Sequence, residues 1–136
     1  MAVIKILIIC LLLCDTQQQC IYLKSPNGYL GESTNLDCGL EDDAIGDIYM
    51  LWSFKKQLSD FTYEILANAT QSGGSVTVTT VNNYIWKVDS TWNNAEKTFT
   101  LTIKNTTLAD ETFWRCEIIA PYTKSLAHVL YIQGEE

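Results

Sequence analysis

The segment 98–117, TFTLTIKNTTLADETFWRCE, constrains the fold more than any other part of the chain. The apolar residues of its first half alternate with threonine: Phe99, Leu101 and Ile103. Alternation with a period of two, in β-branched and aromatic residues, predicts a strand with one dry face and one wet face. A polar corner follows, and a second strand that carries Cys116 is expected to begin at Thr112.

The rest of the chain has the same character, with short apolar runs between turn signals and no helical period. Further strands are predicted at 21–29, 34–39, 48–56, 61–67, 76–81, 84–90 and 126–133. With 47% hydrophobic and 18% charged residues, the 136-residue chain has the composition of a domain with a buried core. Many short strands of this kind indicate an antiparallel β-sandwich.

Three groups of residues match a known family pattern. Asp110 and Trp114 lie six and two residues before Cys116, which resembles the corner D-x-G-x-Y-x-C of immunoglobulin domains. The run 31–38, GESTNLDC, resembles their B-strand pattern G-x-S-x-x-L-x-C, and Trp52 stands where the family has its buried tryptophan. The resemblance covers residues 21–133, and the length between the two cysteines leaves room for the extra strands of the variable type. It implies an all-β immunoglobulin-like sandwich of two sheets and about nine strands.

The resemblance also assigns structural roles. It implies a disulfide between Cys38 and Cys116, which the chain-entropy model values at roughly 4–5 kcal/mol for a loop of this length. It implies a core that contains Leu36, Trp52, Leu101, Ile103 and Trp114. Trp114 replaces the corner tyrosine of the family, so an indole N–H would have to make a different bond. Lys87 matches the basic residue that pairs with the corner aspartate, here Asp110.

Residues 1–16 read as a secretory signal peptide, because Lys5 precedes an uninterrupted apolar run at 6–13 that is too short to span a bilayer. Cleavage as late as Cys20 is an alternative, and a buried N-terminal strand is another. Secretion favours disulfides. If Cys20 survives processing it is an odd cysteine, which suggests an intermolecular bridge or a free thiol. Residues 134–136 form a short acidic tail. Nothing apolar follows Ile132, so neither a membrane span nor a lipid anchor is expected.

Two sequons, at Asn68 and Asn105, are expected glycosylation sites in predicted loops, with unused sequons as the alternative. The acidic loop 40–47 has enough carboxylates to suggest calcium, but it lacks the regular spacing of a calcium loop, and a solvated loop is the simpler interpretation. No metal site is therefore predicted. In the family this loop lies at the recognition end, where its negative charge would favour a basic partner.

The outer face of the front sheet is the candidate binding surface. If Trp52, Trp114 and Cys116 point inward, their neighbours in each strand point outward. Aromatic residues with arginine are typical of interface anchors, and the resemblance places the partner surface on the same face. The outward residues of the candidate face are Tyr49, Leu51, Lys55, Phe113, Arg115, Glu117 and Ile119, with Ser53 between them.

Other function classes have little support. The formal net charge is −7 and the basic residues are scattered, which disfavours nucleic acid and anionic lipid. The single histidine, His128, and the absence of any catalytic motif predict no enzyme and no cofactor. The sequence therefore predicts a secreted domain that binds another protein, such as a cell-surface receptor or a foreign surface, as an immune effector or soluble decoy. The alternatives are an adhesive domain that self-associates, through this face or Cys20, and an ectodomain fragment of a receptor.

Overall fold

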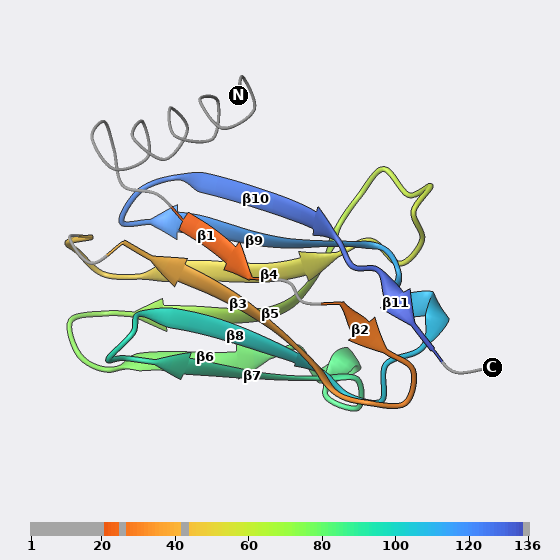
Figure 1. The fold of residues 1–136 in the computed structure, drawn as a ribbon. Coiled ribbons are helices and arrows are strands. Elements are labelled where there is room, and N and C mark those ends of the chain that lie inside the picture. Colours follow the sequence, from red (N-terminus) through yellow and green to blue (C-terminus); the bar gives the residue numbers. More distant parts are fainter. Residues whose placement is uncertain (1–20, 25–26, 42–43, 135–136) are drawn as a thin grey trace, which may run out of the picture.

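The computed structural model describes residues 21–24, 27–41 and 44–134 (Figure 1). The predicted signal peptide, Cys20, Asp42, Asp43 and the last two residues of the acidic tail lie outside this part of the chain. Two 3₁₀ turns are present, η1 (Asn82–Tyr84) and η2 (Leu108–Asp110). The strands are β1 (Ile21–Lys24), β2 (Gly28–Tyr29), β3 (Thr34–Leu40), β4 (Tyr49–Phe54), β5 (Glu64–Gln71), β6 (Val76–Thr80), β7 (Val88–Asn93), β8 (Thr98–Ile103), β9 (Phe113–Ala120), β10 (Lys124–Val129) and β11 (Ile132–Gln133).

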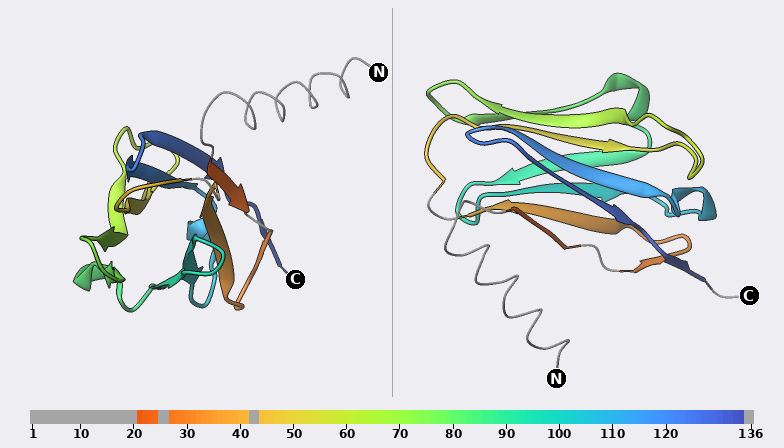
Figure 2. Two further views of the ribbon diagram at one scale, coloured as in Figure 1. Left: turned by 90° about the vertical axis from the view of Figure 1, so that its left-hand side faces the viewer. Right: turned by 90° about the horizontal axis from the view of Figure 1, so that it is seen from above.

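Two sheets face each other across the core (Figure 2, left). The back sheet has the order β1-β3-β8-β7, and the front sheet has the order β10-β9-β4-β5-β6, with all neighbours antiparallel. The predicted first and last strands are each broken in two. The second part of each, β2 in the first predicted strand and β11 in the last, pair in parallel with each other. The predicted antiparallel sandwich of variable type is thus confirmed, with β5 and β6 as the extra strands beside β4.

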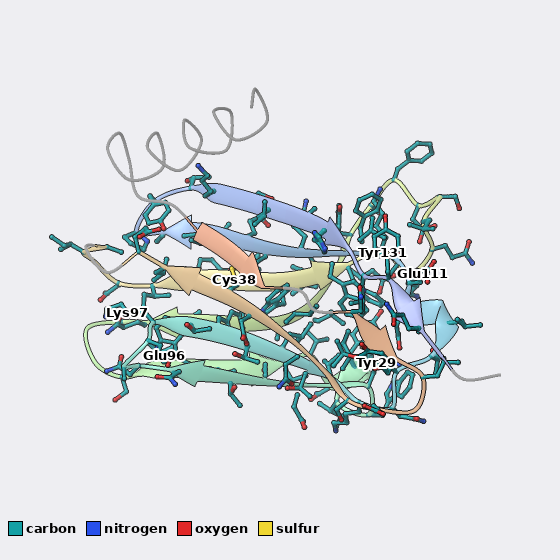
Figure 3. All side chains as sticks on the ribbon, viewed as in Figure 1. Tyr29, Cys38, Glu96, Lys97, Glu111 and Tyr131 are labelled. Carbon is teal, nitrogen blue, oxygen red and sulfur yellow. A yellow bond between two sulfur atoms is a disulfide. The ribbon has the colours of Figure 1, made fainter. Side chains whose placement is uncertain are left out.

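The inner faces of both sheets supply the core, as the alternation predicts. The indole Nε1 of Trp52 donates to the backbone carbonyl of Phe99 at 3.1 Å, and the rings of Phe54 and Trp114 stack at 5.1 Å. A disulfide joins Cys38 on β3 to Cys116 on β9, as predicted, and Figure 3 shows Cys38 midway along the domain. The largest fully buried side chains include Leu36, Trp52, Phe99, Leu101, Ile103 and Trp114.

Two predicted strands begin later than the alternation suggests. The strand expected at 61–67 begins at Glu64, and residues 61–63 belong to the β4–β5 loop, after a turn in which the backbone N–H of Gln57 donates to the Asp60 carboxylate at 3.1 Å. The strand expected at 84–90 begins at Val88. Tyr84 instead ends η1, where its amide donates to the carbonyl of Val81 at 2.8 Å. The start of the first strand is thus replaced by loop residues and the start of the second by a hydrogen-bonded turn.

The connections gather at two opposite ends of the sandwich (Figures 1 and 2). The acidic loop between β3 and β4 lies at one end, with the β5–β6 and β7–β8 turns; we call it the acidic-loop end. The long β4–β5 loop, η1 and η2 lie at the other, which we call the corner end. Figure 3 shows Glu96 and Lys97 at the acidic-loop end and Tyr29, Glu111 and Tyr131 toward the corner end.

Candidate functional site

The outer face of β4 and β9 is set by what these strands bury. On β4, Met50 and Trp52 face the core, and on β9, Trp114, Cys116 and Ile118 do the same. The residues between them face outward on two adjacent strands. Leu51 lies opposite Glu117 and Ser53 lies opposite Arg115 in the register. The outward residues predicted from the sequence are therefore neighbours across the sheet.

Two cations and two aromatic rings form a cluster on this face. The Lys55 ammonium lies 4.9 Å from the centroid of the Phe113 ring and 5.4 Å from that of Tyr63. The Arg115 guanidinium lies 4.0 Å from the Tyr63 ring centroid. A cation over an aromatic face contributes about 0.5–1 kcal/mol at an exposed site and more when a partner excludes water. We call Lys55, Tyr63, Phe113 and Arg115 the cation–aromatic cluster.

Ser53 is covered rather than exposed, which corrects part of the prediction. Its side chain is on the outer side of β4, but the residue is only 1% exposed. The Nε of Arg115 donates to the Ser53 hydroxyl at 3.2 Å, and a second nitrogen of the same guanidinium lies 3.7 Å from a Glu117 carboxylate oxygen. Arg115 is thus held in place by a hydroxyl and a carboxylate, so part of the binding geometry is preformed.

Apolar side chains lie on the same face, with Tyr49 and Ile119 at the other end of β4 and β9 and Leu51 between them and the cluster. Tyr49 is 40% exposed and Ile119 is 39% exposed, while Leu51 and Phe113 are half-buried. The β4–β5 loop adds Phe61, which is 97% exposed. Scattered exposed apolar residues are normal, but several on one face beside aromatic–cation pairs are typical of interaction surfaces.

Sequence reasoning missed Tyr63 and Phe61. Tyr63 was within a predicted strand, and its place beside Arg115 depends on how the β4–β5 loop folds back. Phe61 was expected in a strand and instead stands in the loop. The sequence feature that could have indicated them is the two aromatic residues, Phe61 and Tyr63, soon after a pair of lysines.

Asn68 is not in a loop, contrary to the prediction. It lies in the middle of β5, half-buried, and its register partners are Leu51 on β4 and Thr79 on β6. The small inward residues Ala67 and Ala69 on either side are fully buried, which turns Asn68 toward the outer face. A glycan on Asn68 would therefore stand at the centre of the candidate binding face. Asn105, in contrast, is exposed in a bend after β8, as predicted.

The acidic loop is fastened to its neighbour. The Asp47 carboxylate accepts a hydrogen bond from the backbone N–H of Gly73, in the β5–β6 turn, at 3.1 Å. Within the described part of the chain, no three His, Cys, Asp or Glu side chains are grouped as metal ligands would be.

The corner before β9 is held by Trp114 and Asp110. The indole Nε1 of Trp114 donates to the backbone carbonyl of Asp110 at 2.9 Å, so an indole makes the corner bond for which the family uses a phenol. The Lys87 ammonium lies 2.7 Å from the Asp110 carboxylate, and their side chains are 11% and 5% exposed. The same carboxylate accepts the Thr107 backbone N–H at 2.8 Å. These residues hold the corner in place and have a structural role.

A second polar network joins β5 to η1. The Tyr84 hydroxyl donates to the Glu64 carboxylate, which also lies 3.1 Å from the Lys56 ammonium. Burial, and then the bond to Glu64, raise the pKa of Tyr84 to about 12. The hydrogen bonds from Tyr84 and then Lys56 lower the pKa of Glu64. The network ties the start of β5 to η1 and to Lys56 in the β4–β5 loop, all at the corner end.

The sandwich, its inter-sheet disulfide and the two extra strands define an immunoglobulin-type domain of the variable class. The family model of the immunoglobulin V-set domain matches residues 23–130, so the chain belongs to the immunoglobulin V-set family. Domains of this family are in general non-enzymatic modules that mediate protein–protein interaction. A search among curated proteins found no significant match. None of the helices in the described residues has the length and apolar character to span a bilayer.

Proposed function

We propose that this chain is a secreted recognition domain that binds another protein through the outer face of its front sheet and its loop ends. The observation that carries the proposal is the cation–aromatic cluster, which is preformed and shares its face with exposed apolar groups. Aromatic residues and arginine dominate the energetics of protein interfaces. Binding would rest on shape and charge complementarity, with no turnover. A cell-surface receptor or a foreign surface is the class of partner, which fits an immune effector or soluble decoy.

Secretion rests on residues 1–16 as a signal peptide and on the buried disulfide, which forms and persists in oxidising compartments. Asn105 and Asn68 are the proposed glycan acceptors. Occupancy of Asn68 and use of the full front face exclude each other sterically, because Asn68 lies opposite Leu51. With Asn68 occupied, the interface would be confined to the side of the sheet formed by β4, β9 and β10.

Intact mass of tagged protein from a eukaryotic culture medium tests secretion and the role of Cys20 together. We expect a monomer that begins at residue 17, with one internal disulfide and a mass that falls on deglycosylation. The measurement is made with and without reductant. A mass of twice the chain that halves on reduction would instead assign a Cys20-linked dimer and favour the adhesive alternative. Protein retained in the cell pellet would contradict secretion.

We expect Leu51→Asp and Phe113→Asp each to weaken partner binding by more than about 1 kcal/mol, because each places a charge inside a surface that a partner would desolvate. The domain is first screened, as a tetramer, against a panel of cell-surface receptor ectodomains. The affinity of each variant for the captured ectodomain is then measured by surface plasmon resonance. Thermal unfolding checks that both variants stay folded.

Thr91→Asp is the matched control, because Thr91 is exposed on β7 of the back sheet and receives the same charge. It should bind as the unmodified chain does. Normal binding by both front-face variants would show that the loops carry recognition.

Sedimentation velocity at increasing concentration tests the adhesive alternative, since self-association gives a dimer that Leu51→Asp dissociates. Asn68→Gln, compared in the same assay, reports whether a glycan limits the face.

A further inference from the structure

The corner end carries an exposed tryptophan, Trp86, that is not part of the core. Trp86 is 70% exposed, and its chain neighbour Ile85 is exposed as well. The indole is held in one orientation, because its Nε1 donates to the Asn83 carbonyl at 2.9 Å. A tryptophan carries 150–250 Å² of surface, and covering apolar area is worth about 25 cal/mol per Å². A group that covered this fixed, exposed indole would therefore bury a large apolar area.

A hollow of about 180 Å³ lies beside Trp86. Its walls are mainly apolar, and Lys87 and Asp110 form part of its lining. The last residue of the Asn105 sequon, Thr107, also lines it. The sequon and the exposed indole thus border the same space. The other main lining residues are Phe54, Tyr84 and Ala109.

Hydrogen bonds at the end of the β7–β8 ladder tie the segment that precedes Asn105 to both chain neighbours of Trp86. The β7–β8 ladder ends at the pair Val88 and Ile103. It continues for one more step, because the Lys104 N–H donates to the Lys87 carbonyl at 2.8 Å. Asn105 follows directly, and its φ of 45° takes the chain out of the ladder at the exposed surface. The Lys104 ammonium also donates to the Ile85 carbonyl at 2.8 Å, which ties the two segments together.

We propose that the N-linked glycan of Asn105 lies over Trp86, with its first N-acetylglucosamine stacked on the indole and its acetamide methyl toward the hollow. The apolar C–H face of a pyranose suits an aromatic ring, and the hydroxyls stay in water. This occupant is favoured over a second copy or a protein partner, because it is tethered at the residue next to Lys104, which bonds both chain neighbours of Trp86, and its sequon residue Thr107 lines the hollow. The proposal rests on use of the Asn105 sequon and is independent of the front-face binding proposal.

The modification itself needs only a lipid-diphosphate-linked oligosaccharide as donor. The amide nitrogen of Asn105 forms a bond to the anomeric carbon of the sugar, and the bond from that carbon to the diphosphate oxygen breaks. The amide loses one proton and the lipid diphosphate leaves. Thr107 supplies the hydroxyl residue that the sequon requires.

The test uses the secreted full chain with Asn68→Gln, so that Asn105 is the sole sequon. Three forms are compared: the glycoprotein, the form trimmed to one sugar by an endoglycosidase, and the form stripped by peptide N-glycosidase. Acrylamide quenching of tryptophan fluorescence is the readout. Trp86 dominates it, since Trp52 and Trp114 are buried and Trp92 is half-buried. We expect quenching in both sugar-bearing forms to fall about two-fold relative to the stripped form, because the sugar covers the indole.

Trp86→Phe should abolish the difference between the three forms. A nuclear Overhauser effect between the acetamide methyl and the indole protons should be present in the one-sugar form. Equal quenching in all three forms, or a secreted chain whose mass shows no glycan on Asn105, would overturn the proposal. Protection of Trp86 that appears only with dimerisation would assign the surface to a second copy and overturn it as well.

Discussion

Replacing Cys38 and Cys116 together with alanine is expected to lower the free energy of unfolding by about 4 kcal/mol. The bridge closes a loop with a sequence separation of 78 residues, and its loss returns that loop entropy to the unfolded chain. Domains of this kind have total stabilities of about 5–15 kcal/mol, so the variant would retain only part of its stability. Urea denaturation of the purified variant and the unmodified chain, followed by tryptophan fluorescence, gives the difference.

A cavity at the two buried sites would add to the loss, so a second variant is required as a control. Cys38→Val with Cys116→Ala restores part of the volume without a bridge. If the loss is mainly loop entropy, the two double variants should agree within about 1 kcal/mol, since a volume-conserving change costs little. A loss below about 1 kcal/mol in both would contradict the expectation and show that packing alone constrains the loop.

The features of this fold that could be predicted from the sequence are those that follow from local residue patterns. The alternation of Phe99, Leu101 and Ile103 predicted a buried strand face because the side-chain period of a strand is two. The spacing from Asp110 to Cys116 indicates the corner, and the family resemblance predicts the pair of Lys87 and Asp110 that the structure holds at 2.7 Å. The outward residues of β4 and β9 followed from parity alone.

The parts that it could not predict depend on breaks in that parity. The register of β4 against β5 shifts between Trp52 and Ser53, so that Leu66 and Ala67 are both buried. A β-bulge of this kind reverses the facing of every later residue in the strand. Asn68 was assigned to a loop because the predicted strand ended at Ala67, whereas β5 continues to Gln71 and places Asn68 on the front face. The contact between Tyr63 and Arg115 depends on the folding of a loop, for which no period exists.

Asp110→Ala is expected to cost about 3–5 kcal/mol, because it leaves a buried ammonium without its counter-charge. The Lys87 side chain is 11% exposed and lies 2.7 Å from the Asp110 carboxylate. The change also removes the acceptor of the Thr107 N–H at the start of η2. Urea denaturation measures the loss.

The variant Lys87→Met separates two contributions to this loss: the unpaired Lys87 ammonium and the lost hydrogen bond from the Thr107 N–H. In the double variant the ammonium is gone, so Asp110→Ala should then cost less than it does alone, by about 1–3 kcal/mol of coupling. Strict additivity would mean that the pair contributes nothing as a pair. A buried ion pair is itself weak evidence of net stability, since desolvation offsets most of its attraction. What the cycle would show is that the pair fixes the geometry of the corner, because breaking it is costly although forming it gains little.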